Sequence, residues 1–222
     1  MNSRKRMAFI RIAIAAVAFF CFGYLALRQI PRFDFWTLFS FFALYVLWSI
    51  VETMIYEPPD SLVVDDDDRR SYLYMQLSSL AVLFYALLDF VALHLTRLPR
   101  YEPQVIEAGF AVLLLSFFIR YRALKALGKF YNPRVSVYED HILIEHGAYR
   151  RIRHPFYLSA LLSALSISMI MNSWGALLIT LIGVVPALIY RINLEEAFLL
   201  EHLGERYQAY QWKTKRLVPW IW

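Results

Sequence analysis

The chain has 222 residues, of which 59% are hydrophobic and only 18% are charged. A soluble domain usually has about 45–50% apolar residues, so this composition excludes an ordinary water-soluble enzyme and indicates a protein of the lipid bilayer. The formal net charge of +5 comes mostly from basic residues beside apolar segments, which is typical of membrane topology and anionic head groups rather than of nucleic-acid binding.

The N-terminal half contains apolar runs that predict membrane-spanning helices. The runs 7–27, 35–55 and 72–95 are long enough to cross about 30 Å of hydrocarbon. A fourth run, 105–119, is shorter and has polar residues at both ends that suit the two interfaces. No small-x-small cleavage site follows the first run, so we expect an uncleaved span. The single cysteine, Cys21, lies inside this run and excludes a disulfide framework.

A polar stretch and an apolar hairpin follow. Residues 120–157 are too charged for lipid but rich in Tyr, Val and Ile, which predicts a folded segment outside the hydrocarbon. The apolar segments 158–171 and 174–190 are separated only by Asn172 and Ser173. So short a connection predicts a helical hairpin, whose first arm is short for a full crossing.

The predicted fold is an all-α integral membrane protein, a multi-span helical bundle of about four spans plus a C-terminal helical hairpin. The tail begins as a helix that ends near Gly204, and its aromatic and basic residues suit the head-group layer. We expect N-terminal spans in residues 1–119 and a catalytic region in residues 120–222, divided into a cytoplasmic cofactor segment 120–157, a membrane hairpin 158–190, and a C-terminal helix and tail 191–222.

Basic residues in the short loops predict the orientation. More of them fall on the side of the N-terminus and the polar segment, which places both termini and this segment in the cytoplasm. The residues on that side are Arg4, Lys5, Arg6, Arg69, Arg70 and the cluster from Arg120 to Arg153. The acidic run Asp65–Asp68 falls in the same predicted cytoplasmic loop as Arg69 and Arg70. We interpret it as a solvated loop, with a metal or partner site as the alternative.

The densest group of chemically capable residues runs from His141 to Tyr157. Gly147 permits a tight turn there, and Pro155 suits the first turn of the helix that begins the hairpin. Arg153 and His154 beside that helix N-terminus favour an anionic group such as a carboxylate. An equally good interpretation of these two residues is a basic flank of the hairpin with a capping histidine.

Arg191 and Glu195 are four residues apart at the end of the last apolar segment. This spacing places them on one face of a helix at the membrane boundary. The arginine offers a clamp for a carboxylate, and the glutamate offers a partner for a cation. An ordinary interfacial ion pair explains the same two residues equally well.

Together these residues resemble the isoprenylcysteine carboxyl methyltransferase family, over roughly residues 127–219. Members carry a Gly-x-Tyr-x-x-x-Arg-His-Pro-x-Tyr motif, an apolar hairpin, an Arg/Glu-bearing helix and a Gly-x-x-Tyr-x-x-Tyr tail. Here the first motif runs from Gly147 to Tyr157 and the tail motif from Gly204 to Tyr210. Arg134 stands where the eukaryotic enzymes carry a cofactor-contacting glutamine.

The resemblance implies a methyltransferase that uses S-adenosyl-L-methionine and releases S-adenosyl-L-homocysteine. It implies that Arg191 faces the methyl acceptor and, with Glu195, forms the catalytic pair. The expected cofactor-binding residues are His141, Ile142, Leu143, Ile144, Tyr149, Arg153, His154, Pro155, Phe156, Tyr157 and Glu195. The expected partners are membrane lipids and a lipidic acceptor, prenylcysteine-like or another lipid, whose carboxylate is methylated; no nucleic acid is expected.

Three other functions stay open. Amine methylation of phosphatidylethanolamine requires a base, for which Glu196, Glu201 or His146 are the candidates. A reductase resembling the sterol reductases uses NADPH and also has an Arg-His-Pro motif. The non-enzymatic alternative is a membrane scaffold or a transport component, and Asp89 and His94 in or near a span suggest a proton path. No metal is expected, since no cluster of His, Cys and carboxylates has ligand spacing.

Overall fold

The computed structural model describes residues 17, 31–56, 63–66, 68–98, 103–132, 136–138 and 142–218. Apart from Val17, the expected first span lies outside the described residues, as do Cys21, Arg134 and His141. The chain divides into two compact units, residues 1–56 and 57–222. We describe each unit by itself.

The first unit contains helix α2 (Arg32–Ile55), which confirms the span expected at 35–55. Its hydroxyl side chains donate to carbonyl oxygens four residues earlier, as Ser49 Oγ does to Tyr45 at 2.9 Å and Thr53 Oγ1 to Ser49 at 2.7 Å. Such bonds satisfy polar atoms within the helix itself, as a lipid environment requires.

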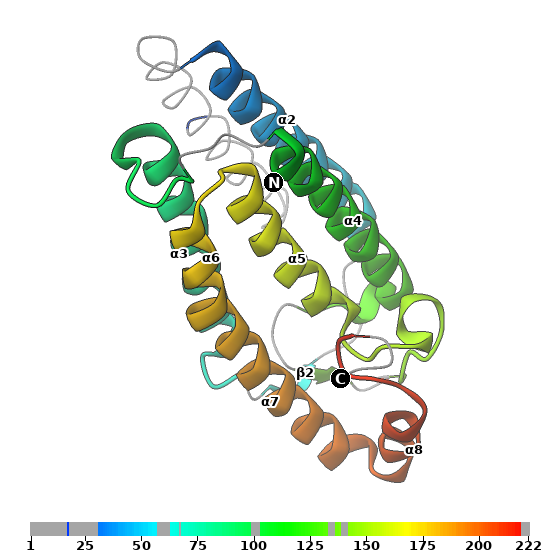
Figure 1. Ribbon diagram of the computed structural model, residues 1–222. Helices are drawn as coiled ribbons and strands as arrows, with labels where there is room; N and C mark the ends of the chain where they lie inside the picture. The colour runs from blue at the N-terminus through cyan, green and yellow to red at the C-terminus, as the bar shows by residue number, and fades with distance from the viewer. Residues whose placement is uncertain are drawn as a thin grey trace. The chain divides into compact units, whose positions relative to one another are not determined.

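The second unit is almost entirely helical (Figure 1). Its elements in chain order are β1 (Val63–Asp66), α3 (Ser71–Leu88) with a π-helical turn (Asp89–Leu93), α4 (Pro103–Leu127) with a 3₁₀ turn (Gly128–Phe130), β2 (Ser136–Tyr138), a 3₁₀ turn (Gly147–Arg150), α5 (Pro155–Ile170), α6 (Trp174–Ile179), a second π-helical turn (Thr180–Val184), α7 (Val185–Leu203) and α8 (Glu205–Lys213).

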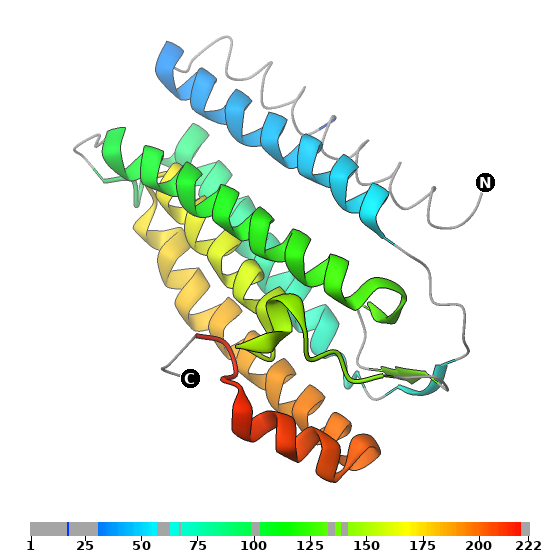
Figure 2. The same cartoon turned by 90° about the vertical axis from the view of Figure 1, so that its right-hand side faces the viewer.

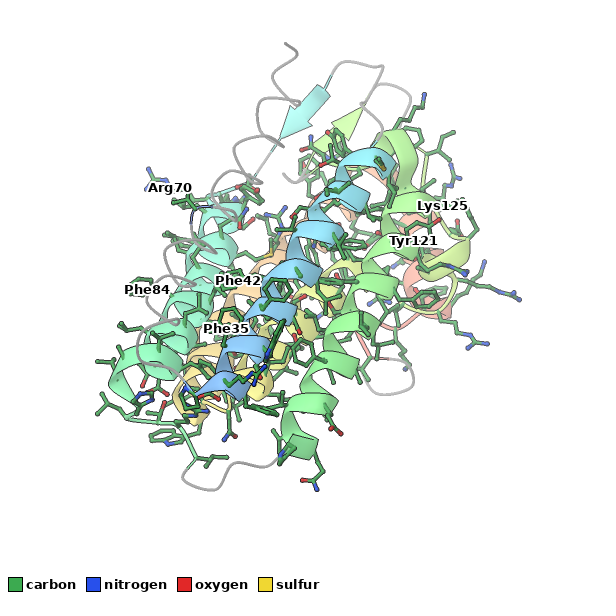
Figure 3. All side chains as sticks on the ribbon, turned by 90° about the horizontal axis from the view of Figure 1, so that it is seen from above. Phe35, Phe42, Arg70, Phe84, Tyr121 and Lys125 are labelled. Carbon is green, nitrogen blue, oxygen red and sulfur yellow. The ribbon has the colours of Figure 1, made fainter. Side chains whose placement is uncertain are left out.

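Four helices in the described part of the chain are long and apolar enough to cross a membrane, namely Arg32–Ile55, Ser71–Leu93, Pro103–Phe130 and Trp174–Leu203. Outward-pointing apolar side chains such as Phe84, which is 67% exposed, are typical of a surface that meets lipid (Figure 3). The all-α integral membrane class is therefore confirmed. The structure adds a two-stranded antiparallel sheet, in which Val63 of β1 pairs with Tyr138 of β2.

The hairpin is present, but its two arms differ in length. The first arm is α5, an apolar helix of 16 residues. The second arm does not end at residue 190, because α6, the π-helical turn and α7 run on to Leu203 as one 30-residue helix. The expected fourth span at 105–119 is likewise longer, extending through α4 to Phe130. Hydropathy alone ended the fourth span too early, whereas the helix end predicted near Gly204 is confirmed by α7.

Helices α4 and α5 lie side by side (Figure 2) and approach closely at a glycine. A Cβ atom added to Gly109 would lie 2.8 Å from Ile170 Cγ1 and 2.9 Å from the Ile170 backbone nitrogen. Further along, the hydroxyls of Ser116 and Ser163 are 2.6 Å apart. In lipid the hydrophobic effect does not drive helices together, because the lipid tails are as apolar as the helix surfaces. Small residues that allow close packing and interhelical hydrogen bonds are the usual means of joining helices there.

Asp89 fastens the hairpin turn to the end of α3. Its buried carboxylate accepts hydrogen bonds from the backbone N–H of Leu95 at 2.8 Å, from Thr96 Oγ1 at 2.6 Å and from Ser173 Oγ at 2.9 Å. Ser173 also caps α6. His94, by contrast, is exposed. These bonds explain why an ionisable residue is buried at the end of a span, with no need to invoke an ion path. The contacts of Asp89 therefore give no support to a transport function.

Candidate active site

The N-terminus of α5 lies at the opposite end of the unit from the turn that follows α3 (Figure 1). Here the N-terminus of α5, residues 191–196 of α7, the start of α3 and the segment after α8 come together through the hydrogen bonds described below. The candidate site therefore assembles from four separate parts of the chain.

The motif segment is held by the tail. Gly147 has φ +63°, the left-handed conformation that a turn there needs. The backbone N–H of Arg153 donates to Lys215 O at 2.7 Å, the N–H of His154 donates to Arg216 O at 3.0 Å, and the N–H of Lys215 donates to Arg151 O at 3.0 Å. The tail thus pairs with the motif like a short parallel strand immediately before α5.

Glu196 is the centre of a buried ion cluster, which we call the Glu196 cluster: Glu196, Arg153, His154 and Arg216. Its Oε1 accepts from Arg153 Nε at 2.7 Å and lies 3.1 Å from His154 Nε2, and its Oε2 accepts from Arg216 Nε at 2.9 Å. Glu196 is only 4% exposed. Both of its oxygens therefore serve to hold the motif, α7 and the tail together.

Arg153 is directed at the tail. Besides Glu196, its Nη1 donates to Gln211 O at 3.0 Å and to Thr214 O at 2.5 Å. Through these bonds Arg153 fixes the segment that carries its neighbours. Contact of this guanidinium with the cofactor stays a prediction.

A second group, which we call the Tyr157 network, comprises Tyr157, Arg191, Glu195, Asp68 and Ser71. The Tyr157 hydroxyl donates to Glu195 Oε2 and accepts from Arg191 Nε at 2.8 Å. Arg191 Nη1 donates to Asp68 Oδ1 at 2.9 Å and to Ser71 Oγ at 2.8 Å. Tyr157 therefore links the guanidinium to Glu195, the two side chains that the four-residue spacing placed on one face.

The two charged groups of the Tyr157 network differ in access. Arg191 is 2% exposed, and its ion pair with Asp68 shows that its position suits a carboxylate. The Glu195 side chain is 28% exposed, and its Oε1 lies 3.9 Å from His154 Nδ1. The site thus offers an anion-binding group and a more accessible cation-binding group joined by one phenol.

Two aromatic residues of the motif, Phe156 and Tyr149, have different surroundings. Phe156 has the Arg120 guanidinium 4.1 Å from its ring centroid and the Tyr131 ring 5.2 Å away. Tyr149 is buried, and its carbonyl accepts from the Tyr210 hydroxyl at 2.7 Å. Burial, with a smaller contribution from the Glu195 charge, raises the pKa of Tyr149 well above its ordinary value, so this phenol stays neutral.

The remaining expected cofactor contacts vary in position. Leu143 packs on Tyr207 and Tyr210, and Pro155 is buried at the start of α5. Ile144 is half-buried and Ile142 is exposed. Across the described ranges, no group of three or more His, Cys, Asp or Glu residues has a geometry that would hold a metal ion.

Three members of these networks were not singled out from the sequence. Asp68 belongs to the acidic run that we interpreted as a solvated loop. Ser71 and Arg216 belong to no motif that the sequence analysis identified. Both acceptors for Arg191 Nη1 lie at least 120 residues from it in the chain. Only the tertiary structure reveals such partners.

A comparison with protein families decides the identity of this region. Residues 109–201 match the model of the Isoprenylcysteine carboxyl methyltransferase (ICMT) family. This segment is an ICMT-family domain. It runs from α4 through the hairpin and includes the motif, Arg191 and both glutamates, so the resemblance noted in the sequence is confirmed.

Curated ICMT relatives are similar over the same half of the chain. The Protein-S-isoprenylcysteine O-methyltransferase of Schizosaccharomyces pombe is 28% identical over 120 residues, which cover 53% of this chain and 50% of the relative. The probable enzyme of Oryza sativa subsp. indica is 32% identical over 116 residues, covering 51% of this chain and 60% of the relative. The matches thus span about half to three fifths of the relatives' length.

A solved structure also aligns with the chain, that of the eukaryotic intramembrane Ras methyltransferase ICMT. The alignment covers 99% of this chain and 95% of that one, with a TM-score of 0.48 and 16% identity. These values are too low to carry an argument about the fold.

Proposed function

We propose that the chain is an S-adenosylmethionine-dependent methyltransferase that methylates a carboxylate of an isoprenylcysteine-like lipidic substrate. The observation that carries the proposal is the Tyr157 bridge within an ICMT-family domain. It holds Arg191, which suits the acceptor carboxylate, next to Glu195, which suits the ammonium of the cofactor.

The side chains around Glu195 fit the amino-acid end of the cofactor. Glu195 is the more accessible of the two glutamates, and its Oε1 lies 3.9 Å from His154 Nδ1. Its carboxylate suits the ammonium group of the cofactor, while Leu143, Tyr149 and Phe156 suit the adenine.

When bound, S-adenosylmethionine supplies a methyl group on a sulfonium, and its transfer to a carboxylate breaks one S–C bond and forms one O–C bond without moving a proton. The protein therefore has to provide position and exclude water rather than an acid or base. Arg191 orients the carboxylate through its planar donors. Arg191 is 2% exposed, so its guanidinium is shielded from water.

Amine methylation is less well supported by the contacts. It requires a base, and both oxygens of Glu196 are bound to cationic side chains. The other candidates, Glu201 and His146, are exposed and take no part in the Tyr157 network. A sterol-reductase-like function lacks support of this kind, since the family match is to methyltransferases.

We further propose that residues 120–222 form the catalytic region, with α4 as its scaffold, and that this region and both termini face the cytoplasm. The distribution of basic residues supports the orientation. The contact of Gly109 with Ile170 supports the role of α4.

The first test is calorimetric titration of the detergent-purified protein with S-adenosylhomocysteine. Saturable binding supports the cofactor assignment; a folded protein that binds NADPH and not S-adenosylhomocysteine overturns it. The second test measures transfer of a labelled methyl group to a prenylcysteine analogue. The matched controls are the same analogue with its carboxylate replaced by a carboxamide, and phosphatidylethanolamine. Labelling of the carboxamide or the phospholipid amine would contradict carboxylate methylation.

A further inference from the structure

Tyr207 has a buried hydroxyl that no protein group satisfies. The residue is 1% exposed, and in the described part of the chain its hydroxyl is the one buried side-chain oxygen or nitrogen without a hydrogen-bond partner. Tyr210, one helical turn later in α8, is also buried, but its hydroxyl donates to Tyr149 O at 2.7 Å. Burying an unmet donor is costly and rare, so we expect a bound water or ligand to supply the missing acceptor.

The position of Tyr207 connects it to the candidate site. Its side chain belongs to a buried cluster with Leu143 and Tyr210, against which Leu199 and Leu203 of α7 pack. Leu143 lies in the segment expected to contact the cofactor. The charges of Glu196 and Glu195 also act on the Tyr207 hydroxyl. The unmet donor therefore lies beside the site rather than in a remote part of the fold.

The surroundings limit the kind of acceptor. Burial first, and then the charges of Glu196 and Glu195, raise the pKa of Tyr207 well above its ordinary value, so the phenol is a neutral donor at physiological pH. Apolar and aromatic neighbours favour a flat, neutral group with acceptor atoms.

We propose that the Tyr207 hydroxyl donates a hydrogen bond to the nucleoside part of S-adenosylmethionine, at an adenine ring nitrogen or a ribose oxygen. This makes Tyr207 a cofactor-binding residue on α8, outside the matched ICMT segment 109–201. The inference rests on the proposed function and adds a specificity contact to the same site.

The experiment compares Tyr207→Phe with Tyr210→Phe, since each removes a single hydroxyl from a buried ring of α8. We expect Tyr207→Phe to bind S-adenosylhomocysteine about two- to tenfold more weakly than the parent, as loss of one hydrogen bond predicts. Its ligand-free melting temperature should be unchanged or higher, because no protein partner is lost. Tyr210→Phe should melt lower without ligand, because it leaves the Tyr149 carbonyl without its donor.

A second probe, 5′-methylthioadenosine, keeps the nucleoside but lacks the amino-acid end. The same weakening for both probes supports the assignment. Weaker binding of S-adenosylhomocysteine alone would assign the hydroxyl to the amino-acid end and overturn it. Unchanged affinity for both, or a lower ligand-free melting temperature in Tyr207→Phe, would also overturn it. If the parent binds neither probe, the proposed function itself fails; a parent that binds and a variant that binds equally well contradict only the inference.

Discussion

Glu195 and Glu196 are adjacent in the sequence but belong to two networks of different character. Glu196 is 4% exposed and has partners on both oxygens, Arg153 and His154 on one side and Arg216 on the other. Glu195 keeps 28% of its side chain exposed and accepts from Tyr157. Both oxygens of Glu196 are therefore bound by protein side chains, whereas the carboxylate of Glu195 stays accessible.

The difference follows from helix geometry and burial. Neighbouring residues on an α-helix point about 100° apart. Glu196 therefore faces Arg153 and the tail, while Glu195 faces Tyr157. A buried carboxylate needs a complete set of partners, and Glu196 has them. Two consecutive glutamates within α7 therefore differ in their surroundings: Glu196 joins the motif to the tail, and Glu195 stays accessible beside Tyr157.

Glu196→Gln should have the largest effect. The substitution keeps the shape but removes the charge, leaving Arg153 and His154 buried without their carboxylate. We expect a loss of about 3–5 kcal/mol in the free energy of unfolding. Thermal or denaturant unfolding in detergent measures it. A variant that unfolds like the parent would show that the Glu196 cluster does not stabilise the tail.

Glu195→Gln is the matched counterpart and should show the opposite pattern. The affinity for S-adenosylhomocysteine should fall about 10- to 100-fold, because a charge-assisted contact to the ammonium is lost. The ligand-free free energy of unfolding should change by about 1 kcal/mol or less. Calorimetric titration and unfolding of the same preparation test both parts. Equal losses of stability in the two glutamine variants would remove the distinction between the glutamates.

Arg191→Lys separates the acceptor step from cofactor binding. The lysine keeps the charge but cannot reach Tyr157 and Asp68 together as the planar guanidinium does. We expect kcat/KM for a prenylcysteine analogue to fall about tenfold, which is roughly 1.4 kcal/mol of transition-state stabilisation. The affinity for S-adenosylhomocysteine should change less than twofold; a parallel loss would place Arg191 at the cofactor instead.

Asp68→Asn should have the smallest effect. The acceptor carboxylate has to share Arg191 with Asp68, so removing one negative charge should lower KM for the acceptor about two- to fivefold and leave kcat unchanged. Steady-state kinetics at fixed cofactor concentration measures this. A higher KM would mean that Asp68 positions Arg191 rather than competing for it.

The sequence predicted the parts of the fold that depend on local patterns. Apolar runs of sufficient length became α2, α3 and α4, and the two-residue break became the hairpin turn, where Asn172 has φ 50° and Ser173 caps α6. The end of the last long helix near Gly204 was also predicted, and α7 ends at Leu203. Hydropathy did not show that the guanidinium of Arg191 within this helix is buried and donates to Ser71 of α3.

The roles of single site residues depended on contacts between distant parts of the chain. The spacing of Arg191 and Glu195 predicted their shared face, and the Tyr157 bridge explains how they act together. For Arg153, proximity to a helix N-terminus favoured a ligand, whereas its donors meet the backbone about 60 residues later. No local pattern specifies such a partner, because it is set by where the tail returns.

The Glu196 cluster also sets an order of events during synthesis. Arg153 leaves the ribosome first, Glu196 follows 43 residues later and Arg216 another 20. Glu196 lies on the second arm of the hairpin itself, so Arg216 is the last member of the cluster to be made. The cluster is therefore complete only once the tail has been synthesised and has folded back on the hairpin.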